Sequence, residues 1–194
     1  MPVNIPNVLT LVRIILIPVL AGVYLAPIAS AYALAAIIFL LAAVTDWLDG
    51  YLARKLDQHS AFGAFLDPVA DKLIVATALV LLATDQWIMQ NVVHRDLFAV
   101  MVAIIVGREI AVSALREWMA ELGKRASVAV NVVGKFKTVM QMVAIVMLLY
   151  REVWLGIPMF RLGEVLFYLA GGLTAWSMVV YLRAAWPSFL DRSG

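Results

Sequence analysis

Four aspartates lie at the ends of two apolar stretches of the chain. Asp46 and Asp49 follow the first stretch, three residues apart, and Asp67 and Asp71 open the second, four apart. Residues at these spacings share one face of a helix, so two adjacent helices could bring all four carboxylates together. Like charges that close require a cation, and oxygen ligation favours Mg²⁺, with Mn²⁺ or Ca²⁺ as alternatives. The pattern therefore predicts a site for a hard divalent cation.

Small and basic residues accompany the acids. Gly50, Ala53 and Gly63 would let a phosphorylated ligand approach the backbone, and Arg54 can hold a phosphate with two hydrogen bonds. The alternative is that each aspartate caps a helix or faces water. Four acids on the inner faces of apolar helices favour the functional interpretation, because ionisable residues within a membrane are costly.

The fixed positions of this region form one motif, eight fixed residues within a span of 26: Asp46-x-x-Asp49-Gly50-x-x-Ala53-Arg54, eight intervening residues, then Gly63-x-x-x-Asp67-x-x-x-Asp71. At every defined position it resembles the signature of the CDP-alcohol phosphotransferases. The resemblance implies that the four aspartates hold two Mg²⁺ or Mn²⁺ ions. It assigns Asp71 the role of general base, although the residues alone do not separate a base from a metal ligand. Cytidine diphosphate would contact five residues: Gly50, Ala53, Arg54, Gly63 and, as a weaker candidate, Thr45.

Three further segments resemble one branch of this family, which transfers a phosphatidyl group to glycerol 3-phosphate. They are Asn4-Ile-Pro-Asn7-x-Leu9-Thr10-x-x-Arg13, Gly107-Arg108-Glu109-Ile-x-Val-Ser113-x-Leu-Arg116-Glu117 and Lys135-x-Lys137-Thr138-x-x-Gln141. The implied reaction converts CDP-diacylglycerol and sn-glycerol 3-phosphate into phosphatidylglycerophosphate and CMP. Other acceptors remain open within the family: serine, inositol phosphate or phosphatidylglycerol. A cation transporter and a structural membrane subunit are the alternatives from other classes.

Basic residues in the later apolar segments are candidates for the acceptor site: Arg108, Lys135, Lys137 and, undecided, Arg116. A pocket that gathers them would suit a doubly charged phosphate. The alternative is that they anchor headgroups or pair with Glu109 or Glu117.

Polar residues also interrupt the first apolar segment. Asn7, Thr10 and Arg13 lie near one face at helical spacing and could support the active site. The alternative for Arg13 is that its side chain reaches out to the lipid headgroups.

Composition fixes the broad class. Hydrophobic residues make up 64% of the 194 residues and charged residues only 14%, so the chain is expected to be an all-α polytopic membrane protein with one domain, 1–194. A net charge of +2 gives no support to nucleic-acid binding, and the absence of cysteine excludes disulfides and thiolate metal sites. Six spans are predicted, at about residues 9–25, 31–46, 62–82, 97–115, 132–150 and 165–182.

The distribution of Lys and Arg predicts the orientation. The loops that hold Arg54, Lys55, Lys124 and Arg125 lie on one side, so the positive-inside rule places both termini and the signature in the cytoplasm. Cleavage of a signal peptide after Ala29-Ser-Ala31 is disfavoured, because Arg13 is the only basic residue before it. We expect a prokaryotic inner-membrane protein and, from the resemblance and Gly171-Gly172, a homodimer.

Overall fold

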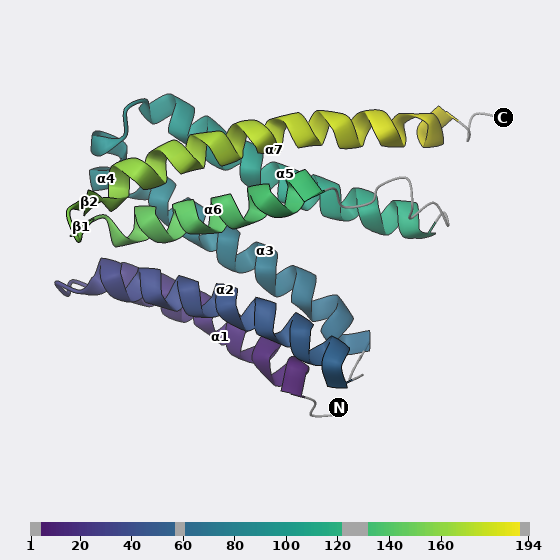
Figure 1. The fold of residues 1–194 in the computed structure, drawn as a ribbon, viewed down its shortest axis with the longest axis horizontal. Helices are drawn as coiled ribbons and strands as arrows, with labels where there is room; N and C mark the ends of the chain where they lie inside the picture. Colours follow the sequence, from purple (N-terminus) through teal and green to yellow (C-terminus); the bar gives the residue numbers. More distant parts are fainter. Residues whose placement is uncertain (1–4, 57–60, 122–131, 191–194) are drawn as a thin grey trace.

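The computed structural model describes residues 5–56, 61–121 and 132–190, and these are almost entirely helical (Figure 1). The elements, in order, are α1 (Ile5–Tyr24), α2 (Ala31–Leu56), α3 (Ala61–Thr84), α4 (Gln86–Asn91), α5 (Arg95–Glu121), α6 (Val132–Tyr150), β1 (Val153–Trp154), β2 (Ile157–Pro158) and α7 (Met159–Leu190). The all-α prediction is therefore confirmed.

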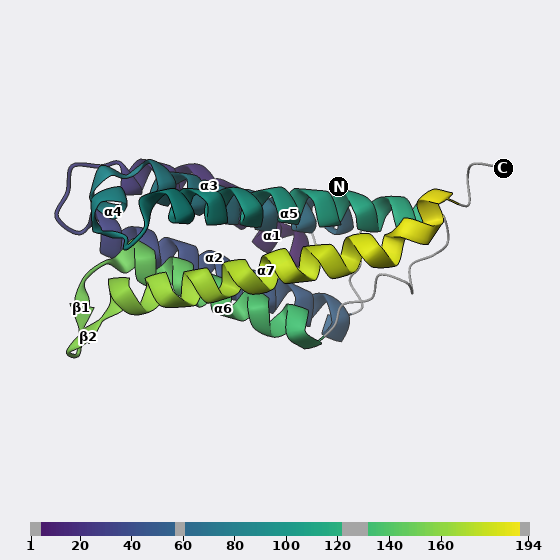
Figure 2. The same cartoon turned by 90° about the horizontal axis from the view of Figure 1, so that it is seen from above.

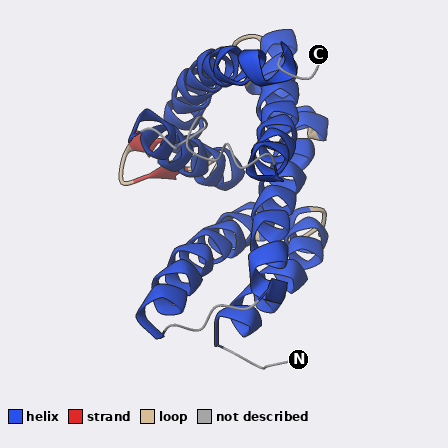
Figure 3. Cartoon of the chain, turned by 90° about the vertical axis from the view of Figure 1, so that its right-hand side faces the viewer, coloured by secondary structure: helices blue, strands red, loops and turns tan. Residues whose placement is uncertain are grey.

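The long helices form a ring. Neighbouring pairs are α1 with α2, α2 with α6, α6 with α7, α7 with α5, α5 with α3, and α3 with α1. Helix α3 also contacts α2 and α6, so it joins the two sides of the ring. Figure 3 shows the helices viewed along the length of the molecule. Helix α1 begins and α7 ends toward the same end of the bundle (Figure 1). The ring places α1, α2 and α3 opposite α5, α6 and α7.

Apolar surface faces outward over most of the described chain. Four helices are long and apolar enough to cross a membrane, at Asn7–Tyr24, Ala31–Tyr51, Arg95–Met119 and Met159–Arg183, and a shorter apolar helix covers Phe136–Tyr150. Large side chains such as Ile15, Ile110 and Trp176 are more than half exposed. Outward-facing residues of this kind belong in lipid. The structure thus supports an integral membrane protein, with four such spans among the described residues.

Some predicted boundaries differ from the observed helices. The second span was placed at 31–46, but α2 continues through the acidic signature to Leu56, since polar residues end a membrane span without ending a helix. The last helix begins at Met159, not at 165. The interval between the predicted spans 62–82 and 97–115 contains α4, whose N-cap Asp85 accepts a hydrogen bond from the Ile88 amide at 3.0 Å.

A small hairpin joins α6 to α7 and projects beyond the helices (Figure 2). Val153 pairs with Pro158 and Trp154 with Ile157. Leu155 and Gly156 both have positive φ, 51° and 79°, as a two-residue turn of type I′ requires.

One glycine of the predicted contact pair packs within the chain. A Cβ on Gly171 would lie 2.7 Å from Sδ at the flexible end of the Met101 side chain, so Gly171 packs directly against α5. At Gly172 a Cβ would meet nothing within 4 Å among the described residues.

Candidate active site

The signature acids gather around one buried arginine. Arg13, in α1, is 0% exposed, and its guanidinium hydrogen-bonds to Asp49 on α2 and Asp71 on α3 and lies 3.3 Å from Asp46. The side chain of Asp49 is 4% exposed, whereas those of Asp46 and Asp71 are 42% and 38% exposed. One carboxylate therefore lies deep in the protein and two reach an accessible space.

The fourth acid is held by the same helix. Thr10 is one turn before Arg13, and its hydroxyl donates a hydrogen bond to Asp67 on α3. Asn7, Thr10 and Arg13 are all buried, at 7%, 1% and 0% exposure. The polar face expected on the first span is therefore turned toward the acids, and Arg13 does not extend to the headgroups.

The signature acids do converge, but the group at their centre is the guanidinium of Arg13. No group of three or more acidic or histidine side chains among the described residues is placed so as to hold a metal ion as it stands. The donor set itself fits a hard divalent cation, because it consists of four carboxylates directed at a common region. One arginine in contact with three of them leaves an excess of negative charge for further cations to balance.

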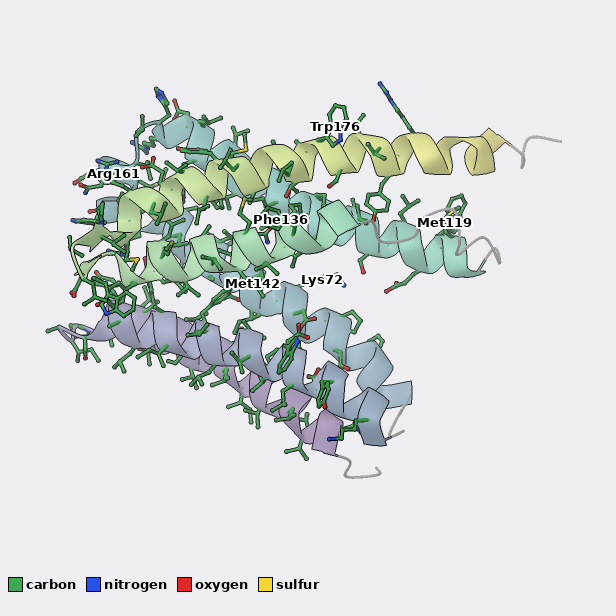
Figure 4. All side chains as sticks on the ribbon, viewed as in Figure 1. Lys72, Met119, Phe136, Met142, Arg161 and Trp176 are labelled. Atoms are coloured by element: carbon green, nitrogen blue, oxygen red, sulfur yellow. The ribbon has the colours of Figure 1, made fainter. Side chains whose placement is uncertain are left out.

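A cavity of about 320 Å³ opens beside the exposed acids. Helices α2, α3, α5 and α6 supply its lining: Asp46, Asp67, Pro68, Asp71, Lys72, Val75, Glu109, Thr138, Gln141 and Met142. Figure 4 shows two of these residues, Lys72 on α3 and Met142 on α6, close together between their helices. The cavity is thus a polar space with three of the four signature acids on its wall.

Basic residues from the later helices meet at Glu109, which lines the cavity. Arg108 donates to Glu109 Oε1 at 2.9 Å, and Lys137 Nζ lies 3.6 Å from the same oxygen. Arg108 also reaches Ser177 Oγ at 3.5 Å and lies over the ring of Tyr181, 5.7 Å from its centroid. The structure therefore shows the pairing with Glu109 that the sequence left as an alternative. Two cations thus share one anion, and we call Arg108, Lys137 and Glu109 the positive cluster.

Several predicted site residues have no described side chain. Those of Ala53, Arg54, Arg116 and Lys135 lie outside the described side chains, although their positions fall in α2, α5 and α6. Thr45 donates its hydroxyl to the Ala42 carbonyl at 2.8 Å, within its own helix. Gly63 is buried in α3 and Gly50 is partly buried in α2.

The cavity adds residues to which sequence reasoning gave no role. Lys72 donates to the Pro68 carbonyl at 2.9 Å, one turn away on α3. Gln141 and Thr138 follow Lys137 at four residues and one residue, so α6 turns Lys137 and Gln141 toward the same side. This helical spacing was a signal that could have added Gln141 to the candidates.

Comparison with known proteins identifies the family. A family model described as CDP-alcohol phosphatidyltransferase matches residues 3–180. Proteins from Salmonella typhimurium (strain LT2), Escherichia coli (strain K12) and Shigella flexneri are each 50% identical over 193 residues, covering 99% of this chain and all of the relative. Each bears the name CDP-diacylglycerol–glycerol-3-phosphate 3-phosphatidyltransferase. The chain belongs to the CDP-alcohol phosphatidyltransferase family, as its signature predicted.

Proposed function

We propose that this protein transfers the phosphatidyl group of CDP-diacylglycerol to sn-glycerol 3-phosphate, giving phosphatidylglycerophosphate and CMP. The observation that carries the proposal is the full-length, 50% identity to proteins named for this reaction. The cavity supports it independently, because acids line one part of its wall and a positive cluster adjoins another. These are the groups needed for a pyrophosphate donor with its cations and for a phosphorylated acceptor.

The donor side of the site is formed by the signature acids. Asp46, Asp49, Asp67 and Asp71 would hold two Mg²⁺ or Mn²⁺ ions, in keeping with their all-oxygen donor set. When bound, these ions supply neutralisation of the pyrophosphate and polarisation of the attacked phosphorus. The chain itself contributes a fixed positive charge at Arg13, and the hydroxyl of Thr10 orients Asp67.

Asp71 is the proposed general base, and it also serves as a ligand. Its side chain is 38% exposed and lines the cavity, so an acceptor hydroxyl can reach it. The hydroxyl oxygen forms a bond to the phosphorus that carries diacylglycerol, the bond from that phosphorus to CMP breaks, and the hydroxyl proton passes to Asp71. No covalent enzyme intermediate is needed, because direct attack requires mainly positioning and charge stabilisation.

The remaining predicted residues complete the two substrate sites. Arg108 and Lys137, held together by Glu109, would bind the acceptor's phosphate with Lys135 and Arg116 as further members. Cytidine diphosphate would lie along the α2 and α3 positions of the signature: Gly50, Ala53, Arg54 and Gly63, with Thr45 the weakest member because its hydroxyl is engaged within α2.

An apolar groove supports a lipid donor. Between α2 and α6 lies a hollow of about 490 Å³, lined by Ala33, Ala36, Ile37, Leu40, Ala43, Met142, Val143, Val146, Met147, Tyr150, Trp154 and Met159. Met142 lines both this hollow and the polar cavity. An acyl chain in the groove would therefore lie next to the reacting phosphorus in the cavity.

The membrane setting is part of the proposal. We place six spans in a bacterial inner membrane, with both termini and the cavity on the cytoplasmic side, and a homodimer as the assembly. The excess of Lys and Arg in the loops on the signature side supports this orientation. Cytoplasmic access also suits a water-soluble acceptor such as glycerol 3-phosphate.

The test is CMP release by the purified protein in detergent, with CDP-diacylglycerol and Mg²⁺. Glycerol 3-phosphate, serine, inositol phosphate and phosphatidylglycerol are offered in parallel. The proposal expects CMP only with glycerol 3-phosphate. CMP with another acceptor would replace the substrate within the family, and no CMP with any acceptor would overturn the proposed activity.

A further inference from the structure

One amide oxygen on the cavity wall has no hydrogen-bond donor in the described part of the chain. Gln141 is 3% exposed, and its Oε1 accepts no hydrogen bond among the described residues. The same residue lines the polar cavity. Buried polar atoms are nearly always satisfied by the protein or by a bound molecule, so an amide oxygen without a protein donor beside a cavity is placed to accept a hydrogen bond from a molecule in that cavity.

The position of Gln141 narrows the chemistry of that donor. It lies one turn of α6 beyond Lys137, which belongs to the positive cluster at Glu109. Asp71 and Asp46 line the same cavity. A molecule that presents its phosphate to the positive cluster and its reacting hydroxyl to Asp71 therefore has its middle within the space that Gln141 also lines.

The amide is suited to a hydroxyl. It is uncharged, so it neither repels a phosphate nor competes with the acids for cations, and it can both accept and donate. Glycerol 3-phosphate carries one hydroxyl that neither reacts nor bears phosphate, on its central carbon. The positive cluster would bind the phosphate of the acceptor, and the acids would contact its reacting hydroxyl. The secondary hydroxyl is then the group that still needs a partner.

We propose that Gln141 is a specificity-determining residue, whose amide oxygen accepts a hydrogen bond from the secondary hydroxyl of the acceptor alcohol. The inference rests on the proposed function and deepens it. Gln141 takes no part in bond making; it selects acceptors with a hydroxyl at this carbon. A site built around such a bond discriminates against an analogue that lacks the hydroxyl, because the buried amide oxygen is then left unpaired.

The experiment compares two acceptors on two proteins. The acceptors are glycerol 3-phosphate and 3-hydroxypropyl phosphate, which keeps the primary hydroxyl and the phosphate but lacks the secondary hydroxyl. The proteins are the wild type and Gln141→Met, whose side chain is similar in size and whose thioether is only a weak hydrogen-bond acceptor. We expect the wild type to favour glycerol 3-phosphate in kcat/KM by about tenfold or more, and Gln141→Met to reduce that preference to about threefold or less.

A matched substitution controls for general effects. Gln90→Met changes the same residue type on the exposed face of α4 and should leave the preference unchanged. The KM for CDP-diacylglycerol should be the same in all three proteins. Equal losses with both acceptors in Gln141→Met would mean a structural role and overturn the inference.

The wild type alone provides a second test if the variant does not fold. Equal kcat/KM for the two acceptors would overturn the role of Gln141 while leaving the proposed reaction in place. Failure of glycerol 3-phosphate as an acceptor, with CMP formed from another alcohol, would instead overturn the proposed function.

Discussion

Two arginines with buried side chains lie near opposite ends of α1, and their partners differ in number and kind. Arg13, in the first half, contacts three carboxylates, those of Asp46, Asp49 and Asp71. Arg151, at the other end, hydrogen-bonds to the hydroxyl of Tyr24, the last residue of α1, and pairs with one carboxylate. The first cluster has an excess of negative charge, and the second is balanced.

The balanced cluster is enclosed by aromatic rings. Arg151 pairs with Asp85 Oδ2 at 2.6 Å, and Tyr24 donates to the same oxygen at 3.0 Å. The guanidinium carbon lies 3.6 Å from the ring centroid of Tyr32 and 5.2 Å from that of Trp87. The cluster joins residues from four separate segments of the chain, so it stabilises the packing of these segments against one another.

The comparison teaches how to interpret buried charge in this protein. An ion pair whose charges cancel, and whose partners come from several elements, stabilises the fold. A cluster whose charges do not cancel is expensive unless ligands complete it, so it marks a functional site. The following experiments test that distinction.

Removal of divalent cations should give the largest effect. Excess EDTA is expected to reduce CMP release to background, because the proposed site relies on bound cations to neutralise the pyrophosphate. Mg²⁺ or Mn²⁺ added back should restore it. Activity that persists after exhaustive chelation would contradict the proposed role of the four acids.

Replacing one acid at each cluster should separate catalysis from stability. Asp71→Asn is expected to lower kcat by about 10²- to 10⁴-fold, since the proposed base is lost. Asp85→Asn should leave kcat within about twofold and lower the thermal midpoint instead, because it weakens a partly buried, hydrogen-bonded ion pair. The measurements are initial rates of CMP release and unfolding in detergent. Comparable kcat losses in both variants would remove the distinction between the two clusters.

Replacing each arginine by methionine should show a second difference between the two clusters, in how Mg²⁺ affects the stability of the variants. Arg151→Met leaves the partly buried Asp85 without its cation and is expected to cost about 1 to 3 kcal/mol of unfolding free energy. Arg13→Met should also destabilise, but Mg²⁺ should recover part of that loss, because cations can replace the missing charge among the acids. Denaturant titrations with and without Mg²⁺ measure both effects. Equal responses to Mg²⁺ would argue that the acids do not bind it.

Acidification should lower the thermal midpoint by weakening the Arg151–Asp85 pair, and this effect should be smaller than those of the substitutions. Burial raises the pKa of Asp85, but hydrogen bonds from Arg151, the Ile88 amide and Tyr24 outweigh it, so the pKa is lower than its ordinary value of 3.8. The pair therefore stabilises the fold above about pH 4, and this contribution is lost as the pH falls through the lowered pKa. The thermal midpoint of the wild type should decline toward that of Asp85→Asn below pH 4. A constant difference down to pH 2 would contradict this assignment.

The sequence predicted the acid cluster because its information is local. Spacings of three and four residues indicate which aspartates share a helix face, and the predicted bounds 132–150 agree with α6. The balanced cluster could not be predicted in this way, since Arg151 and Asp85 are 66 residues apart in the chain. Their pairing depends on how α1, α3 and α6 pack.

The partners of the buried charged side chains could not be predicted from the sequence either. For Arg13 the same residue was compatible with lipid headgroups or with the acids, and only the rotation of α1 against α3 decides between them. For Arg108 and Lys137 the two alternatives were a phosphate or Glu109, and the structure shows Glu109. The apolar composition predicts that such charged side chains need partners. Only the tertiary structure shows which residues those partners are.

The ring of helices has a consequence for the energetics of substrate binding. Asp67 and Asp71 on the cavity wall come from the N-terminal half of the chain, whereas Glu109 and Gln141 come from the C-terminal half. An acceptor held at both walls would therefore act as a non-covalent cross-link between the halves. Its binding free energy would add to the cohesion of the protein, so the enzyme would resist unfolding most strongly while engaged in turnover.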